Sequence, residues 1–132
     1  MLGEQLYTGQ GKRGARRVLD TRPLKIEASF EDSGKLLGID GMNIGTYTAI
    51  ARADGTLAGE GQGVFATVDG SMVTWKGNGV GTMKGGGAVS YRGALTLETT
   101  SSNLARLNSV AGVFEFEEDA SGNTQTKIWE WK

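Results

Sequence analysis

The sequence predicts an all-β fold, an antiparallel meander that closes into a barrel of about eight strands. Apolar and polar residues alternate with a period of two through most of the 132 residues. Turn signals made of Asp, Asn and Gly recur at short intervals. The chain also has 22 glycines and a single proline, and most of the glycines lie inside the alternating runs. With no linker or low-complexity tail, residues 1–132 are expected to form a single β-barrel domain.

The expected strands cover residues 5–20, 25–31, 36–40, 44–53, 57–68, 72–83, 89–99, 113–118 and 124–131. The most regular is 25–31, in which Ile26, Ala28 and Phe30 share one face. The residues 32–35, Asp-Ser-Gly-Lys, have the composition of a hairpin turn in which Gly34 supplies a positive φ. The same reasoning places turns at 53–56, 69–70, 84–87 and 119–123.

One segment, residues 101–108, breaks the alternation. Leu104 and Leu107 are spaced i, i+3, with good helix formers between them. Ser102 or Asn103 could cap the helix at its start. The sequence therefore predicts one short helical segment near 102–108, as a plug or a crossover before the last hairpin.

The glycines favour a barrel over a flat sandwich. Two long central strands each place three glycines on one face: Gly59, Gly61 and Gly63 on the first, and Gly77, Gly79 and Gly81 on the second. Glycine in a strand costs roughly 0.5–1 kcal/mol relative to alanine, so these positions need a reason. A tightly coiled wall supplies one, and large aromatics could fill the space. An eight-stranded barrel can also hold one small ligand, which makes Trp75, Tyr91, Gly61 and Gly79 the candidate ligand-binding residues.

The composition excludes several classes of chemistry. The chain has no Cys and no His, which rules out thiol nucleophiles, a Ser-His-Asp triad and the usual zinc ligands. No metal site and no cofactor is expected. The net charge of −1 offers no broad field to attract nucleic acid or a membrane surface, so neither is an expected partner. Without a signal peptide or a long apolar run at the start, the expected location is cytoplasmic.

Three motifs are better explained by structure than by ligands. Residues 9–14 match a dinucleotide fingerprint, but too few residues follow for a crossover helix. Residues 119–130 have part of a calcium-loop spacing, but Thr124 stands where that loop requires Gly, so a hairpin turn is expected. The basic cluster at 12–17 has no aromatic platform beside it except Tyr7, and a charged, solvated edge strand explains it.

Polar residues on the central strands leave two interpretations open. They are Glu60, Gln62, Lys76, Asn78, Arg92 and Glu98. If this face points inward, Glu60 could act as a general base and Arg92 could bind an anion, and these two are the candidate catalytic residues. If it points outward, the interior consists of Leu57, Phe65, Val73, Trp75, Tyr91, Leu95 and Leu97. Apolar residues are more frequent on the second face, which favours the outward assignment.

The Gly-rich strands between Gly59 and Leu97, with their Asp-Gly turn, and the ending at 127–132 resemble small prokaryotic β-barrel proteins. Their architecture is similar to that of allene oxide cyclase and calycin-like barrels. The resemblance implies a cavity for a hydrophobic ligand and, in the cyclase group, homo-oligomers, but it carries over no catalytic residue.

Three hypotheses of function follow. The leading one is a small barrel that binds an apolar or amphipathic small molecule. The second is a metal-free isomerase or cyclase that acts inside the barrel. The third is a structural homo-oligomer without a ligand, with Trp129 and Trp131 at the interface. Whether the chain is an enzyme at all stays open, with a binding role favoured.

Overall fold

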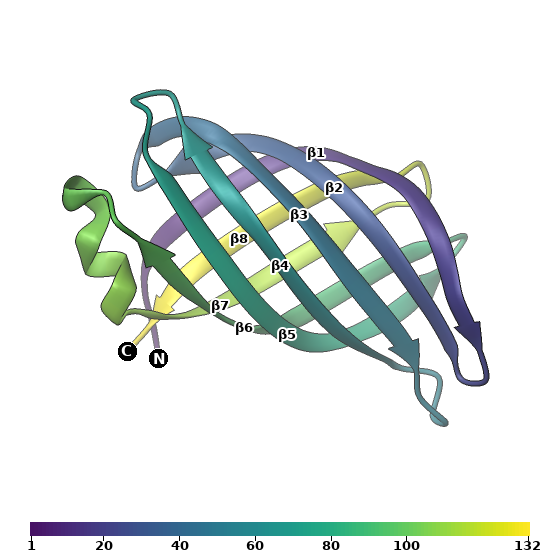
Figure 1. Ribbon diagram of the computed structural model, residues 1–132. Helices are drawn as coiled ribbons and strands as arrows, with labels where there is room; N and C mark the ends of the chain where they lie inside the picture. The colour runs from purple at the N-terminus through teal and green to yellow at the C-terminus, as the bar shows by residue number, and fades with distance from the viewer.

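The computed structural model describes residues 1–132 and is a closed antiparallel barrel in which each strand pairs with the next and β8 pairs with β1 (Figure 1). The strands are β1 (Leu2–Thr21), β2 (Leu24–Leu36), β3 (Ile39–Ala51), β4 (Leu57–Thr67), β5 (Met72–Gly85), β6 (Ala88–Thr99), β7 (Ala111–Glu118) and β8 (Asn123–Trp131). The closed, eight-stranded antiparallel meander agrees with the predicted fold class.

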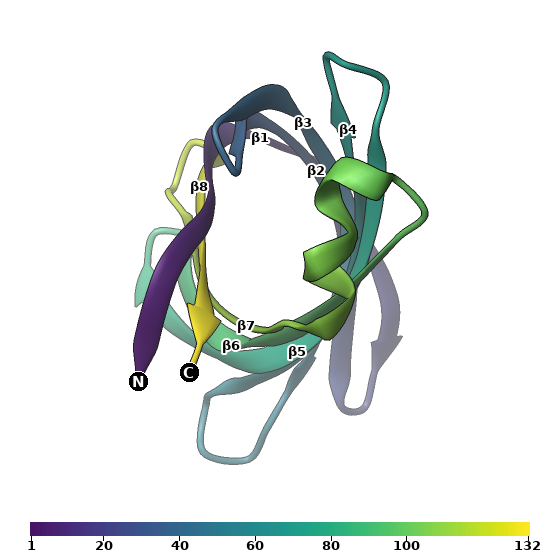
Figure 2. The same cartoon turned by 90° about the vertical axis from the view of Figure 1, so that its left-hand side faces the viewer.

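The two ends of the barrel differ. At one, the helix end, lie both chain termini and the 3-10 helix η1 (Ser102–Ser109), which confirms the predicted helical segment (Figures 1 and 2). Leu104 and Leu107 of η1 are 2% and 0% exposed and belong to the main core cluster, so η1 covers this end. At the other, the hairpin end, lie the turns of the β1–β2, β3–β4, β5–β6 and β7–β8 hairpins. No helix in the structure is long and apolar enough to cross a membrane.

The prediction of a turn at residues 32–35 is wrong. β2 continues through these residues, and the chain turns at Leu37 and Gly38, whose φ angles are +48° and +83°. The polar run misled the prediction because Asp32 faces the interior, on the same side of β2 as Phe30, and is 2% exposed. Gly34 is a strand residue that gives room to β1, since a Cβ there would lie 2.6 Å from the Cα of Gly9.

The glycines of the central strands make room for aromatic rings inside the barrel. A Cβ on Gly63 would lie 2.7 Å from the indole of Trp75, and one on Gly81 would lie 2.6 Å from the ring of Tyr91. The face that carries Leu57, Phe65, Val73 and Trp75 is therefore the interior. The polar face with Glu60 points outward, as the count of apolar residues favoured.

The strand β1 is longer than its place in the barrel requires. Its pairing with β8 ends at Lys12 and Asn123, whereas its pairing with β2 continues to Thr21 and Leu24. The β1–β2 hairpin therefore extends past the end of β8 and leaves one edge of β1 unpaired (Figure 1). This agrees with the edge strand expected for Arg16 and Arg17, whereas Lys12 pairs with β8 and Arg13 is largely buried. By contrast β8 is paired on both edges, so a free edge at the chain end gives no reason for self-association.

Candidate functional site

The interior of the barrel holds a small cavity of about 60 Å³. Six of its lining residues are aromatic: Phe30, Tyr47, Trp75, Tyr91, Phe114 and Phe116. The glycines of β4 and β5 form one wall, and Thr126 and Ile128 of β8 also contribute to the lining. Asn43, Glu60 and Asn78 also belong to the lining, but the surface that the cavity exposes is largely apolar.

Five of the six aromatic rings, all except Phe114, form one connected group. The centroids of Phe30 and Phe116 are 4.8 Å apart, and those of Tyr47 and Tyr91 are 5.5 Å apart, in tilted and edge-on arrangements that aromatic pairs prefer. Trp75 joins the group through Phe30 at 6.3 Å. Such rings have few accessible rotamers when packed together, so the walls of the cavity are held in place by one another.

A buried ion pair lies at the hairpin end of this group. Glu118 is 4% exposed and accepts hydrogen bonds from the Tyr47 hydroxyl at 2.8 Å and from Arg13 Nε at 2.9 Å. Burial and the neighbouring Glu118 carboxylate raise the pKa of the Tyr47 hydroxyl. Tyr47 is therefore a fixed hydrogen-bond donor, committed to Glu118, and Arg13 and Glu118 neutralise each other.

A second polar group lies deeper in the barrel, around Asp32. Its carboxylate accepts hydrogen bonds from the hydroxyls of Tyr7 and Thr126, the latter at 2.7 Å. Asn43, beside Asp32, accepts a bond from the Trp75 indole N–H at 2.8 Å. No cation pairs with Asp32. Burial raises the pKa of the Asp32 carboxyl and outweighs the hydrogen bonds that lower it.

The raised pKa of Asp32 predicts a pH dependence of folding stability. A carboxyl whose pKa is higher in the folded than in the unfolded protein binds a proton on folding, so it favours folding most below the ordinary Asp pKa of about 4. That contribution is lost as pH rises through the folded-state pKa. The variant Asp32→Asn stays neutral and keeps an acceptor oxygen, so its stability relative to the wild type should increase with pH.

Urea unfolding of both proteins at a series of pH values between 4 and 8 measures this difference. Exposed carboxylates such as Asp54 and Asp119, whose pKa values are lowered by hydrogen bonds from Thr56 and Asn123, contribute a slope of opposite sign. They contribute equally to both proteins and cancel in the difference. Parallel curves for wild type and Asp32→Asn would refute the prediction.

Two hydroxyls of the interior have no partner in the protein. Thr124 Oγ1 is the one fully enclosed side-chain oxygen without a hydrogen bond. The Tyr91 hydroxyl makes no hydrogen bond either, in contrast to those of Tyr7 and Tyr47. Burial, and then the charge of Glu118, raises the pKa of Tyr91 to about 12. Tyr91 thus lines the cavity and carries a hydroxyl that has no partner in the protein and stays protonated at neutral pH.

The residues proposed from the sequence fall into two groups. Trp75, Tyr91, Gly61 and Gly79 all line the interior cavity. A Cβ on Gly61 would lie 3.2 Å from the Cβ of Tyr47, so a side chain there would narrow the space. The candidate ligand-binding residues are therefore brought together by the fold.

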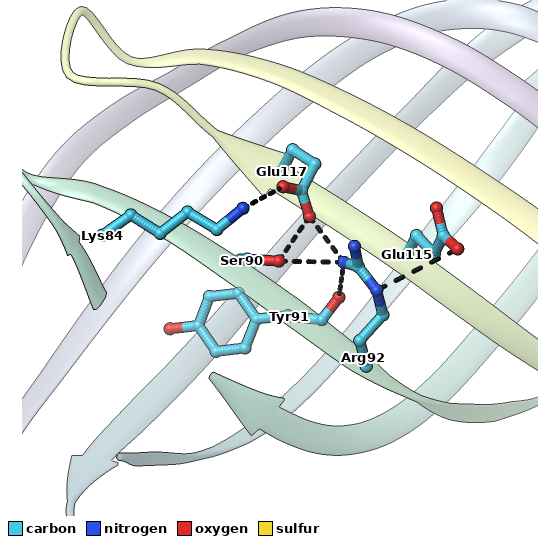
Figure 3. Close-up of polar contacts among 6 residues, drawn as sticks. All are labelled: Lys84, Ser90, Tyr91, Arg92, Glu115 and Glu117. Carbon is cyan, nitrogen blue, oxygen red and sulfur yellow. Dashed lines mark hydrogen bonds and ion pairs between the residues drawn. The ribbon is translucent and has the colours of Figure 1, made fainter. Parts of the chain in front are cut away.

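The candidate catalytic residues are on the outward-facing side of the strands, although Glu60 also contributes to the cavity lining. Glu60 is exposed and has no partner. Arg92 donates to Glu117 at 2.5 Å and to Ser90 at 3.0 Å, and it lies 4.0 Å from Glu115 (Figure 3). Burial raises the pKa of Glu117, but the bonds from Arg92 and Ser90 outweigh it and lower that pKa. With its guanidinium held by two carboxylates on the surface, Arg92 is not placed to bind an anion inside the barrel.

The outer wall also carries a shallow groove of about 630 Å³. Its lining residues come from six strands, β2 to β7, and include Glu60, Gln62, Lys76 and Asn78. The polar face of the sequence analysis is therefore the floor of an open, hydrated groove rather than an enclosed site.

Sequence reasoning missed the buried polar residues Arg13, Asp32, Asn43 and Glu118. Asp32 was obscured by the assignment of 32–35 as a turn, and Asn43 by the break placed between the expected strands 36–40 and 44–53, where β3 in fact runs continuously. Arg13 was counted with a solvated cluster, and Glu118 with the end of a strand. The signal that could have found Asp32 is its phase, since it continues the inward set Ile26, Ala28 and Phe30 at a spacing of two.

Comparisons with known proteins find the same fold and no assigned function. No family model matches the chain, and no curated protein matches it. A solved protein with unknown function from Clostridium acetobutylicum ATCC 824 is 15% identical with a TM-score of 0.84, and the match covers 96% of each chain. A beta-barrel like protein from Acinetobacter baumannii AYE is 12% identical with a TM-score of 0.81, covering 98% of this chain and 94% of that one.

A more distant neighbour is an enzyme from Penicillium herquei, which is 20% identical with a TM-score of 0.63. The match covers 96% of this chain and 92% of that one. At these identities the likeness concerns the fold alone. It supports the prokaryotic β-barrel resemblance at the level of architecture, whereas the likeness to the cyclase group is not specifically supported.

Proposed function

We propose that the barrel binds a small, neutral, largely apolar molecule, about the size of a single ring, in the cavity beside Trp75 and Tyr91. The observation that carries this proposal is the aromatic-lined cavity with the unpaired Tyr91 hydroxyl. An apolar wall with one free donor favours a ligand that has an apolar body and one acceptor oxygen, such as a carbonyl group.

The charge of the site limits the ligand further. Arg13 and Glu118 neutralise each other at 2.9 Å, and both carry further hydrogen bonds, so neither offers its charge to a ligand. A charged molecule would therefore lose its hydration without gaining a counter-ion, which is costly. A neutral molecule avoids this cost.

The size of the cavity sets a second limit. A volume of 60 Å³ is well below the roughly 300–1,000 Å³ of pockets that hold drug-sized ligands. Trp75 is hydrogen-bonded to Asn43 and Tyr47 to Glu118, and Phe30, Tyr91 and Phe116 pack against other rings. Phe114 has neither kind of contact, so binding of a single ring requires a rotation of the Phe114 side chain and no change of the barrel.

An isomerase or cyclase is the alternative, but the geometry favours it less. The carboxyl groups inside the barrel, Asp32 and Glu118, do not line the cavity, and their oxygens are occupied by hydrogen bonds within the protein. A general base needs a free oxygen within reach of the substrate. We therefore place binding ahead of catalysis.

Titration with two matched ligands tests the proposal. Acetophenone has a ring and a carbonyl, and ethylbenzene has the same shape without the oxygen. We expect both to shift the indole N–H resonance of Trp75 in nuclear magnetic resonance spectra, with acetophenone binding about five- to tenfold more tightly because of one added hydrogen bond.

The variant Tyr91→Phe should abolish this preference and leave the free energy of unfolding within about 0.5 kcal/mol of the wild type, since no bond within the protein is lost. As a control, Tyr47→Phe removes a bond to Glu118 and should destabilise the fold while keeping the preference for acetophenone. If neither ligand shifts Trp75 at millimolar concentration, the binding proposal fails.

Self-association without a ligand is the third hypothesis. Trp131 is 60% exposed at the end of β8, where a second copy could cover it. Native mass spectrometry reports subunit number and retained ligand together. A stable oligomer that retains no small molecule, combined with a failed titration, would favour the structural role.

A further inference from the structure

The charge of the chain is unevenly distributed. Residues 12–25, which we name the basic hairpin, carry six Lys or Arg side chains and one Asp. The other 118 residues carry eight Lys or Arg and fourteen Asp or Glu. The overall charge of −1 therefore combines a hairpin of +5 with a remainder of −6.

Most of the basic hairpin, from Gly14 onward, extends beyond the point where the pairing of β1 with β8 ends (Figure 1). Residues 15–22 are all exposed. Two of its six cations are paired, Arg13 with the buried Glu118 and Arg17 with Glu27 at 3.3 Å. The other four, Lys12, Arg16, Arg22 and Lys25, have no ion-pair partner. These charges are thus available to an anionic partner.

Aliphatic side chains are exposed among these cations. Val18 is 62%, Leu19 40% and Leu24 42% exposed, around the turn that contains Pro23. Exposed apolar side chains also occur elsewhere on the barrel, as at Val68 and Met72, but at this tip three aliphatics lie among arginines and form a surface that is both apolar and cationic. Neither edge-strand protection, which needs charges alone, nor core packing explains them.

We propose that the basic hairpin docks the protein on an anionic lipid surface. The aliphatic side chains enter the interface between headgroups, and the flanking guanidinium groups contact lipid phosphates. Charge complementarity selects an anionic surface. The protruding aliphatic tip selects a bilayer over a protein, which would need a matching recess, and over nucleic acid, for which residues 12–25 offer no aromatic platform.

This proposal revises the expectation that a net charge of −1 excludes a membrane surface, because that figure averages over the whole chain. Docking through the hairpin would turn the hairpin end of the barrel toward the lipid and leave the acidic remainder in water. It does not depend on the ligand-binding proposal, and the variant Tyr91→Phe should dock normally.

Co-sedimentation with lipid vesicles tests the proposal on the full chain. We expect binding to vesicles of 70% phosphatidylcholine and 30% phosphatidylglycerol in 50 mM salt, weaker binding in 500 mM salt, and little to phosphatidylcholine alone. Arg16→Glu should lower the partition coefficient roughly tenfold or more. The matched control Lys76→Glu makes the same change of charge on the outer wall of β5 and should lower it much less.

A second pair of variants tests insertion. Leu19→Ser with Leu24→Ser should weaken binding at least several-fold, whereas Val68→Ser with Met72→Ser, at exposed positions of the helix end, should not. If Arg16→Glu fails to fold by circular dichroism, Arg16→Gln replaces it. No binding to anionic vesicles in 50 mM salt overturns the proposal. Binding that depends on Arg16 but not on the leucines, and is equalled by binding to heparin, also overturns it and indicates a soluble polyanion.

Discussion

Replacement of Gly11 by alanine should destabilise the barrel by about 3 kcal/mol or more. A Cβ at this position would overlap the carbonyl oxygen of Glu31 and lie 2.5 Å from the Cα of Asp32. Both obstacles are backbone atoms of the paired strand β2, so no side chain can turn away to make room. The strands would have to separate beside the buried Asp32, whose hydrogen bonds to Tyr7 and Thr126 depend on their spacing.

Gly14, on the same strand, offers a matched control. A Cβ there would meet only the carbonyl oxygen of Ser29, at an ordinary distance of 3.5 Å, and neither glycine has a positive φ. Gly14→Ala should therefore be neutral or stabilising by up to about 1 kcal/mol, because alanine has less freedom in the unfolded chain. Urea unfolding of both variants measures the difference. Equal stabilities would mean that Gly11 is not held by close contact with β2.

The glycines show how much of the barrel wall could be predicted from the sequence alone. Their number and phase predicted a coiled wall with aromatics over it, and Trp75 over Gly63 and Tyr91 over Gly81 confirm that expectation. The periodicity of two was sufficient to place these residues on one face. It could not show whether a ring or a ligand fills the space, because that depends on the volume left when all strands are closed.

The turns show a similar limit. Turns with glycine after aspartate, at Gly55 and Gly70, were located correctly, and both glycines have a positive φ near 90°. At residues 32–35 the same composition lies inside β2. Local sequence cannot distinguish the two cases, since the choice depends on whether Asp32 finds hydrogen-bond partners on the neighbouring strand β1 and on β8 beyond it.

The candidate site was predicted in part for the same reason. Its apolar residues, such as Trp75 and Tyr91, can be identified from the alternation of apolar and polar residues along their strands. Its polar members are paired with residues distant in the chain: Arg13 and Glu118 are separated by 105 positions and meet only because β1 closes the barrel against β8. A buried ion pair of this kind has no local signal, and a charged residue is by default assigned to the surface.

The variant Glu118→Ala should also be strongly destabilised, with a loss of about 3–5 kcal/mol in the free energy of unfolding. The side chains of Arg13 and Glu118 are 14% and 2% exposed, so the variant leaves an enclosed guanidinium without a counter-charge and Tyr47 without its acceptor. Asp40→Ala is the control. The charged atoms of Lys35 and Asp40 are only 2.7 Å apart, but the two side chains are 60% and 65% exposed. Loss of this exposed ion pair should therefore cost no more than about 1 kcal/mol of folding stability.

A double-mutant cycle separates the ion pair from the space that Glu118 fills. If the buried charge of Arg13 causes the loss, Arg13→Ala combined with Glu118→Ala should cost clearly less than the sum of the single variants, with a coupling above about 1 kcal/mol. Unfolding in urea with 50 mM and 500 mM sodium chloride supplies a second criterion, since salt screens an exposed pair but not an enclosed one. Additive costs, or a Glu118→Ala variant as stable as Asp40→Ala, would show that this pair does not hold the hairpin end of the barrel together.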